Sequence, residues 1–410
     1  MNTRPFKNSE VGPIPKDWEV KRLGKIWTSF KTGPFGSSLH ARDYVRNGIP
    51  IINPMHLLNG IILPSVDMSV DDGTAHRLSA YQLGENDVVI GRRGEIGRVA
   101  LVTSHESGWL CGTGCFFVHF KPTIHAPYVA LYLRTPRCVE RLVGEAVGTT
   151  LINLNQSILA KTLVALPPLS EQRRISAALS EADDWIASLD KLIEKKKLVK
   201  QGAMQALLSG KTRLPGFSGE WEERRLGEIG VFPTNTVPTD SVKLSEYIGT
   251  DNMLPDRAGV EKYEDVLPYK NVREYRMGDV LISNIRPYLK KIWLADRNGG
   301  CSTDVIVIRI RDKDVLIPEF LFSKLADASF FDFVMNNAIG TKMPRGDKRM
   351  MEMFRIPVPT LAEQRAIASV LSDMDAELAA LSREKAKAEQ IKQGMMQELL
   401  TGRVRLAEGE

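Results

Sequence analysis

The chain has 410 residues, of which 43% are hydrophobic and 26% are charged, as is typical of soluble proteins with more than one domain. No apolar run approaches the ~18 residues of a membrane-spanning helix, and the N-terminus lacks the apolar core of a signal peptide. We therefore expect a cytoplasmic protein. The net charge of +5 is too small for bulk charge alone to indicate a nucleic-acid partner.

The four cysteines form no CxxC pair and no repeated ligand spacing. Cys111 and Cys115 could bind a metal together with His105 or His119. Buried, reduced thiols are the simpler interpretation, so we predict no metal site.

An internal repeat organises the chain. Residues 166–214 align without gaps with residues 358–406, and 22 of the 49 aligned positions are identical. The segment Trp18–Gly24 recurs as Trp221–Gly227, at an offset of 203. The repeat predicts five segments: a globular domain 1–166, a helical spacer 167–210, a globular domain 211–358, a second helical spacer 359–402 and a tail 403–410.

Both globular domains show mixed secondary-structure signals at an offset of 192. Strands rich in β-branched residues are predicted at 87–90 and 279–282, and again at 116–118 and 308–310. Short helices are predicted at 128–133 and 320–325, each following a proline. Gly148-Thr149 and Gly340-Thr341 mark a common turn before the last strand of each domain.

Each spacer has the apolar spacing of a coiled-coil seam. Lys196, Lys200, Lys385 and Lys392 interrupt the stripe. The predicted seam consists of Ile175, Leu179, Ile186, Leu189, Ile193, Leu207, Ile367, Leu371, Met374, Leu378, Leu381 and Leu399. We expect the two helices to bury these stripes against each other in antiparallel order. About 38 residues per helix, at ~1.5 Å each, give roughly 57 Å.

Capping residues mark the ends of these helices. Thr360 and Glu363 fit a capping box, and Ser170 is the expected N-cap of the first copy. Gly210 and Gly402 are expected to end the helices.

Polar and apolar residues also recur along the helices. Gln172, Gln364, Gln201 and Gln393 could bond where helix meets domain or could face a partner. Trp185, Met204, Met395 and Met396 are expected to be exposed and to serve a second interface.

These motifs resemble the specificity subunit of type I restriction–modification systems over nearly the whole chain. The resemblance rests on the paired Trp-Glu-x-x-Arg-Leu-Gly segments and the Pro-x-Leu-x-Glu-Gln-Arg-x-Ile junctions. The helix ends Lys200–Gly210 and Lys392–Gly402 add to it. It implies an α+β fold with two mixed α/β target-recognition domains, separated by two long antiparallel helices that form a coiled coil with pseudo-twofold symmetry.

The resemblance also implies a function and a set of partners. Each domain would read one half of an asymmetric, bipartite site in double-stranded DNA. The helices would set the spacer and dock modification (methyltransferase) subunits, of which we expect two. Restriction (motor-nuclease) subunits would join through the complex.

The sequence carries no motif for chemistry of its own. Asn53-Pro54-Met55 lacks the second proline and the aromatic ring of a methyltransferase tetrad, and no GxxxxGK[ST] phosphate loop exists. Glu19-Val20-Lys21 has nuclease-like spacing, but we interpret it as a strand edge. We therefore expect a non-catalytic subunit that binds no cofactor. S-adenosylmethionine, ATP and Mg²⁺ are expected on partner subunits.

DNA-binding candidates in domain 1 lie in two places. A Gly/Ser loop could place cations and N–H groups against phosphate. A second loop follows a strand and could reach guanine O6/N7. The alternatives are a surface turn and a charged hairpin tip. The candidates are Lys31, Ser37, Ser38, Arg42, Arg46, Arg92 and Arg93.

Domain 2 has candidates at equivalent positions. Asn284 has the donor and acceptor that suit adenine N6/N7, and a cationic group beside Gly340-Thr341 could hold phosphate. A helix-end charge cluster without a ligand is the alternative. The candidates are Asn284, Arg286, Lys290, Lys342, Arg345 and Lys348.

Two other classes of function stay open. A pure assembly scaffold would need no DNA contact, and an enzyme would need methyl transfer by the chain alone. The weak charge of residues 215–360, with 21 basic and 22 acidic side chains, keeps the scaffold in consideration.

Overall fold

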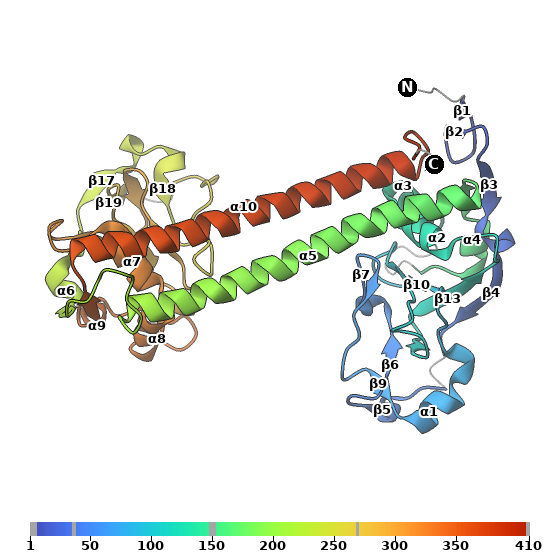
Figure 1. The fold of residues 1–410 in the computed structure, drawn as a ribbon, viewed down its shortest axis with the longest axis horizontal. Helices are drawn as coiled ribbons and strands as arrows, with labels where there is room; N and C mark the ends of the chain where they lie inside the picture. Colours follow the sequence, from blue (N-terminus) through green and yellow to red (C-terminus); the bar gives the residue numbers. More distant parts are fainter. Residues whose placement is uncertain (1–5, 35–37, 147–152, 268–269, 407–410) are drawn as a thin grey trace. The chain divides into compact units, whose positions relative to one another are not determined.

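The computed structural model describes residues 6–34, 38–146, 153–267 and 270–406, and Figure 1 shows the course of the chain. Two compact units are present. Unit 1 comprises residues 1–189 and 384–410, and unit 2 comprises residues 190–383. Each unit therefore contains part of both long helices. In the described ranges no helix combines the length and apolar character needed to cross a bilayer.

A four-stranded antiparallel sheet forms the centre of unit 1, in the order β11–β10–β13–β4. The predicted strands at 87–90 and 116–118 are thereby confirmed. The strand bounds are β4 Trp27–Thr32, β10 Val88–Gly91, β11 Val99–Leu101 and β13 Cys115–Phe120.

Unit 2 repeats this sheet in the order β21–β20–β23–β16. Strand β20 lies 192 positions after β10, so the offset seen in the sequence is the offset of the fold. The bounds are β16 Gly230–Val231, β20 Val280–Ser283, β21 Ile292–Leu294 and β23 Val305–Ile310.

A second four-stranded sheet in each unit contains one parallel pair, β6 with β12 and β18 with β22. In unit 1 the strands are β5 Tyr44–Val45, β6 Ile49–Ile52, β9 Ser69–Val70 and β12 Leu110–Cys111. In unit 2 they are β17 Thr236–Pro238, β18 Tyr247–Ile248, β19 Asn271–Tyr275 and β22 Gly299–Cys301.

The repeated Trp segments form a strand beside the last strand of each unit. Strand β3 (Glu19–Arg22) pairs with β14 (Leu163–Leu166), and β15 (Glu222–Arg225) pairs with β24 (Arg355–Val358). Glu19 and Lys21 thus lie on a strand at the edge of the unit, as expected. Two small pairs complete unit 1, namely β1 Phe6–Lys7 with β2 Ile14–Pro15 and β7 Leu57–Leu58 with β8 Ile61–Ile62.

Three short helices of each unit occupy equivalent places, and those predicted at 128–133 and 320–325 are confirmed. Gly148-Thr149 lies outside the described residues. The helix bounds in unit 1 are α1 Asp72–Arg77, α2 Ala126–Leu133, α3 Pro136–Glu145 and α4 Gln156–Lys161. Those in unit 2 are α6 Leu226–Ile229, α7 Pro318–Ala326, α8 Ala328–Asn336 and α9 Lys348–Glu352.

The two long helices are α5 (Leu169–Leu208, 40 residues) and α10 (Leu361–Leu399, 39 residues). Left-handed glycines follow them, since Gly210 has a φ of 70° and Gly402 a φ of 72°. The predicted C-terminal ends are thereby confirmed.

The predicted N-terminal ends need correction. The expectation that Ser170 caps α5 is wrong, because the helix already begins at Leu169. The carbonyl oxygen of Pro168 instead accepts from the backbone N–H groups of Glu171 (2.9 Å) and Gln172 (3.0 Å). A proline at this place has no N–H to lose, so it starts the helix at little cost. At α10, Thr360 Oγ1 accepts a long hydrogen bond of 3.5 Å from Glu363 N–H.

Ion pairs within each unit show that the helix segments run antiparallel. In unit 2, Lys196 lies 2.6 Å from Glu377 and Lys200 pairs with Asp375, so positions rise on α5 as they fall on α10. In unit 1, Lys392 pairs with Asp183. Three of the four lysines that interrupt the apolar stripe, Lys196, Lys200 and Lys392, thus reach acidic residues on the opposite helix, each pair contributing about 0–1 kcal/mol. Lys385 lies 3.7 Å from Glu389 on its own helix.

The predicted seam is only partly buried, because two helices cover a narrow stripe of each other. Eight of its residues are buried, and Ile186, Met374, Leu378 and Leu381 are half-buried. The buried ones are Ile175, Leu179, Leu189, Ile193, Leu207, Ile367, Leu371 and Leu399.

The ends of the seam merge with the cores of the two units. In unit 1 the core takes in Ile175, Leu179 and Leu399. In unit 2 it takes in the seam residues Leu207, Ile367 and Leu371, and also Met204. The expectation that Met204 is exposed is wrong, since 6% of it is accessible while Trp185 is 42% accessible. Met395 and Met396 are also only partly exposed, against the core of unit 1.

One glutamine binds the start of each long helix to its own unit. The side chain of Gln172 accepts from His125 N–H (2.9 Å) and donates to the carbonyl of Pro167 (2.8 Å). Gln364 repeats this geometry with Ile317 N–H (3.0 Å) and the carbonyl of Pro359 (2.8 Å). Their role is therefore structural.

A buried carboxylate at each helix start holds three chain segments together. In unit 1, Glu171 accepts from Trp18 Nε1 (3.2 Å) and from both prongs of Arg405. In unit 2, Glu363 accepts from Trp221 Nε1 (3.1 Å) and from Arg213 Nε and Nη2, both at 2.6 Å. We call each set a Trp–Glu–Arg clasp.

The clasp in unit 1 also includes Asp17, which accepts from Arg405 at 2.9 and 3.0 Å. Hydrogen bonds from the guanidinium to Asp17 and Glu171 raise the pKa of Arg405 above its usual value. Glu171 is 2% exposed, so its carboxylate is buried against these partners.

We predict that Arg405→Ala destabilises unit 1 by roughly 2–4 kcal/mol, because it leaves the buried Glu171 carboxylate without its cation. Urea unfolding of the whole chain measures the change. The matched control is Arg355→Ala, which removes an exposed pair with Glu223 and should cost less than about 1 kcal/mol. Equal losses in the two variants would contradict a special role for the clasp.

Candidate nucleic-acid interface

Three loops of unit 2 meet at one end of its central sheet, where β20 ends. Asp256 and Arg257 donate their backbone N–H groups to the carbonyls of Leu289 (2.9 Å) and Lys290 (3.1 Å). The N–H of Arg286 reaches the carbonyl of Pro344 at 2.9 Å. We call residues 251–261, 284–291 and 339–347 together the basic loop cluster.

The backbone of this cluster is strained. Non-glycine residues with positive φ include Asp256 (53°), Arg257 (66°), Arg286 (52°) and Lys290 (50°). A left-handed conformation costs an L-residue about 1–2 kcal/mol. The other described non-glycine residues with positive φ are all asparagines, which tolerate that region well.

Cations crowd this strained region. Arg286 and Lys342 are exposed, and neither forms an ion pair with a residue in the described ranges. Arg345 is tied to Asp304 at 3.3 Å. Burial lowers the pKa of Arg257 and of Lys291, whose Nζ donates to the carbonyl of Thr250 at 2.7 Å.

Asn284 points inward. Its Oδ1 is buried and has no hydrogen-bond partner in the structure, while its carbonyl accepts from Gly346 N–H at 3.1 Å. Reading adenine requires both the amide oxygen and the amide nitrogen, so Asn284 would have to turn outward to do it.

Lys348 lies apart from the cluster. It starts α9, its Nζ sits 5.1 Å from the ring centre of Phe232, and Glu352 is 4.0 Å away. The structure therefore brings Asn284, Arg286, Lys290, Lys342 and Arg345 together and leaves Lys348 outside.

The equivalent hairpin of unit 1 carries Arg92 and Arg93. The guanidinium of Arg92 lies 5.2 Å from the ring centre of Phe116, and burial, with the nearby Arg93, lowers its pKa. Arg93 is exposed and forms a β-bridge with Asn153. Arg93 is thus the better placed of the two to meet a ligand.

The Gly/Ser loop candidates lie near α1. Lys31 Nζ donates to the carbonyl of Ala80 (2.9 Å), and the carbonyl of Ser38 accepts from Arg77 (2.7 Å). Arg42 is exposed, and Arg46 lies 3.4 Å from Asp67 with both side chains largely exposed. Ser37 lies outside the described residues.

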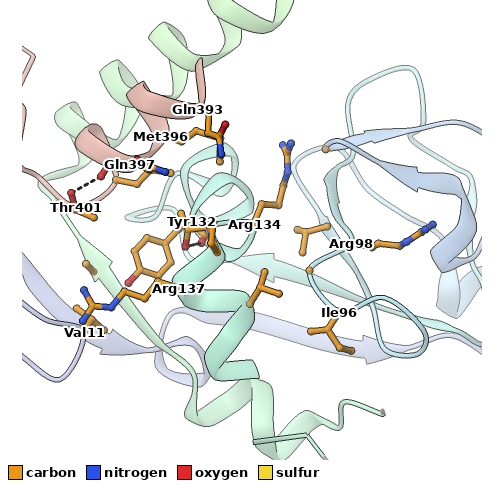
Figure 2. A pocket seen from close by; sticks show the side chains of 18 of the residues that line it. Val11, Ile96, Arg98, Tyr132, Arg134, Arg137, Gln393, Met396, Gln397 and Thr401 are labelled. Carbon is orange, nitrogen blue, oxygen red and sulfur yellow. Dashed lines mark hydrogen bonds between the residues drawn. The ribbon is translucent and has the colours of Figure 1, made fainter. Parts of the chain in front are cut away.

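Unit 1 contains a cavity of about 650 Å³, and Figure 2 shows side chains that line it. Arg134 projects into it and donates to the carbonyl of Asn59 at 2.6 Å; burial lowers its pKa. The one carboxylate in the described lining is Glu95, which Arg98 holds at 2.8 Å. The lining therefore offers no pair of catalytic acid and base.

The thiols are buried and unpaired. Burial raises the pKa of Cys138 and of Cys301 to about 12, which makes them poor nucleophiles and poor metal ligands. Within the described ranges no group of three or more His, Cys, Asp or Glu side chains could hold a metal ion.

Fold and site together define a protein with two copies of one mixed α/β unit, joined through shared helices and carrying basic loops that differ between the copies. The family described as type I restriction modification DNA specificity domain matches twice, at residues 15–198 and 218–393. The chain belongs to this family.

Similar proteins agree over nearly their full lengths. The chain is 26% identical to the protein named as the MjaX specificity subunit of Methanocaldococcus jannaschii, covering 98% of this chain and 97% of that one. It is 24% identical to the type I restriction enzyme MjaVIII specificity subunit of the same organism, covering 98% and 96%. The type I restriction–modification S subunit from M. genitalium has the same fold, with a TM-score of 0.57 at 17% identity, covering 96% and 97%.

Sequence reasoning missed Arg257 and Arg134. Neither has a basic counterpart 192 positions away, since those places hold Ser65 and Ala326. The segment Pro255–Gly259 predicts a turn from its proline and glycine. It does not predict that the turn contacts the backbone of Lys290.

We predict that Lys342→Ala weakens DNA binding to all sequences alike and lowers the salt slope of log K by about 1, because an exposed lysine on a loop contacts phosphate. Titrations of DNA at several salt concentrations measure it. Arg345→Ala, whose guanidinium is already paired with Asp304, should change the slope less. A loss confined to one DNA sequence would contradict the phosphate role of Lys342.

Proposed function

We propose that the chain is the sequence-specific DNA-binding specificity subunit of a type I restriction–modification complex, and that each unit reads one half of an asymmetric, bipartite site. The observation that carries the proposal is the repeated sheet order, β11–β10–β13–β4 and β21–β20–β23–β16, beneath hairpins of different sequence. Two units with the same scaffold but different loops can recognise two different half-sites.

The helices act in this proposal as the spacer. At about 1.5 Å per residue, the 40 residues of α5 correspond to about 60 Å. This is an upper bound of roughly 18 bp between the outer limits of the two half-sites, at ~3.4 Å per base pair.

Modification subunits, two in number, dock on this chain in the proposal, and restriction subunits join through the complex. Exposed apolar residues on the helices support a second interface: Leu192 is 39%, Leu198 68%, Val199 51% and Ile391 43% exposed. Contiguous apolar surface on a protein marks an interaction site, and Leu192 and Val199 lie seven residues apart, on one face of α5.

In this proposal the partner subunits carry out catalysis, and the protein acts in the cytoplasm. S-adenosylmethionine, ATP and Mg²⁺ bind to those subunits, and this chain supplies target choice alone. The absent sequence motifs and the lining of the unit 1 cavity support that division.

The test is selection of DNA by the chain in complex with its modification subunit, from a library of duplexes. The expected result is a split motif with two different halves. A continuous or palindromic motif contradicts the proposal. The scaffold function is favoured if the complex selects no DNA sequence and if the double substitution Arg286→Ala and Lys290→Ala does not change its DNA affinity.

We predict that a seven-residue insertion in both helices lengthens the DNA spacer by about 3 bp. Seven residues add about 10 Å and preserve the coiled-coil seam, and one base pair spans ~3.4 Å. Motif selection measures the spacer. The control inserts seven residues into the loop 215–220, which should leave the spacer unchanged. Equal spacers for both insertions would contradict the ruler role.

A further inference from the structure

Arg286 occupies a backbone position that the fold itself makes unfavourable for an arginine. It lies in the hairpin between β20 and β21, and the equivalent hairpin of unit 1 lies between β10 and β11. Counting 192 positions back from Arg286 gives Gly94. Both residues are left-handed, with φ of 52° for Arg286 and 77° for Gly94.

Glycine is the residue that adopts this conformation without strain. The equivalent hairpin of unit 1 has Gly94 at this position, so the hairpin closes without a side chain here. A Cβ atom added at Gly94 would meet no atom within 4 Å. In unit 2 the strain at Arg286 therefore serves the side chain and not the turn. Strained residues that their surroundings hold in place occur at binding sites.

The surroundings hold Arg286 firmly. Its N–H donates to the carbonyl of Pro344, and its carbonyl accepts from Leu289 N–H, both at 2.9 Å. The neighbouring Ile285 forms a β-bridge with Arg345. The base of the side chain is fixed, while the side chain itself is exposed.

No carboxylate in the described ranges pairs with Arg286, unlike Arg345 beside it. An unpaired guanidinium on a fixed loop can donate two hydrogen bonds to O6 and N7 of guanine, the commonest base contact of arginine in the major groove. A contact with phosphate does not need a side chain on a fixed backbone position. Lys342 on the adjoining turn is suited to such a contact.

We propose that Arg286 is the residue that specifies one guanine in the half-site recognised by unit 2. The inference rests on the proposed function and adds to it which residue reads which base. Unit 1 has no counterpart at Gly94, so the two half-sites are read by different positions of the same hairpin.

The experiment selects DNA from a duplex library with the complex of this chain and its modification subunit, as wild type and as Arg286→Gly. We expect the wild type to yield a split motif. The variant should lose one guanine of one half, with discrimination at that base falling roughly 10- to 100-fold, and keep the other half unchanged. Its melting temperature should be equal or higher, because glycine relieves the strain.

Two further variants serve as controls for backbone flexibility and for a general effect of removing surface charge. Arg286→Asn tolerates the left-handed region and should give the same loss without added backbone freedom. Lys313→Ala, an exposed residue beyond the opposite end of β23, should leave every position of the motif intact.

The possible outcomes distinguish failure of the role of Arg286 from failure of the proposed function. A wild-type split motif that Arg286→Gly and Arg286→Asn leave unchanged at every position overturns the inference and leaves the proposed function standing. A uniform loss of affinity for all sequences makes Arg286 a phosphate contact and also overturns the inference. No split motif with the wild type defeats the proposed function itself.

Discussion

The Trp–Glu–Arg clasp is the constraint on which the arrangement of each unit depends. A carboxylate in the first turn of a helix interacts favourably with the helix dipole, but Glu171 and Glu363 are 2% and 1% exposed and need a cation. That cation, Arg405 or Arg213, follows the end of the other long helix, and the indole comes from the segment that enters the unit. One buried charge thus joins the start of one helix, the end of the other and the edge strand. This fixes the antiparallel order that the interhelical ion pairs also show.

The clasp explains why the sequence repeats so clearly where it does and why its contacts could not be predicted. The motif residues at the helix junctions are those that form the clasps and the glutamine bonds, so the repeat located both long helices and their terminal glycines. Periodicity does not tell which charged residue becomes buried, however. Glu171 finds its arginine 234 positions away, and its indole 153 positions away. The N-cap was misplaced for a similar reason: Ser170 has the better side chain, but Pro168 already supplies the carbonyl and the backbone angle.

The candidate site was predictable to the extent that it follows the repeat. Arg286 and Lys290 were found because their hairpin is equivalent to the one that carries Arg92 and Arg93 in unit 1. Arg345 was found because it lies close to the repeated turn at Gly340-Thr341, and the structure gathers all three residues in one cluster. Arg257 joins that cluster through a backbone contact with Lys290, which no local pattern announces. The direction of Asn284 depends on packing against Gly346, where the oxygen would lie 3.0 Å from an added Cβ. Sheets and helices carry the shared core, and the loops above them are free to differ.

The basic loop cluster carries a local excess of positive charge in unit 2, and this distribution affects how a DNA-binding unit discriminates among sequences. Residues 215–360 carry 21 basic and 22 acidic side chains, so the basic loop cluster is a local excess on a nearly neutral surface. Non-specific affinity grows with the number of phosphates that a protein neutralises, and a small cluster neutralises few. If the cluster has its proposed role, base contacts then supply a larger share of the binding free energy, and discrimination between sites depends on that share rather than on total affinity. A hydrogen-bonded loop adds to this effect, since a backbone that is already in position loses little entropy on binding.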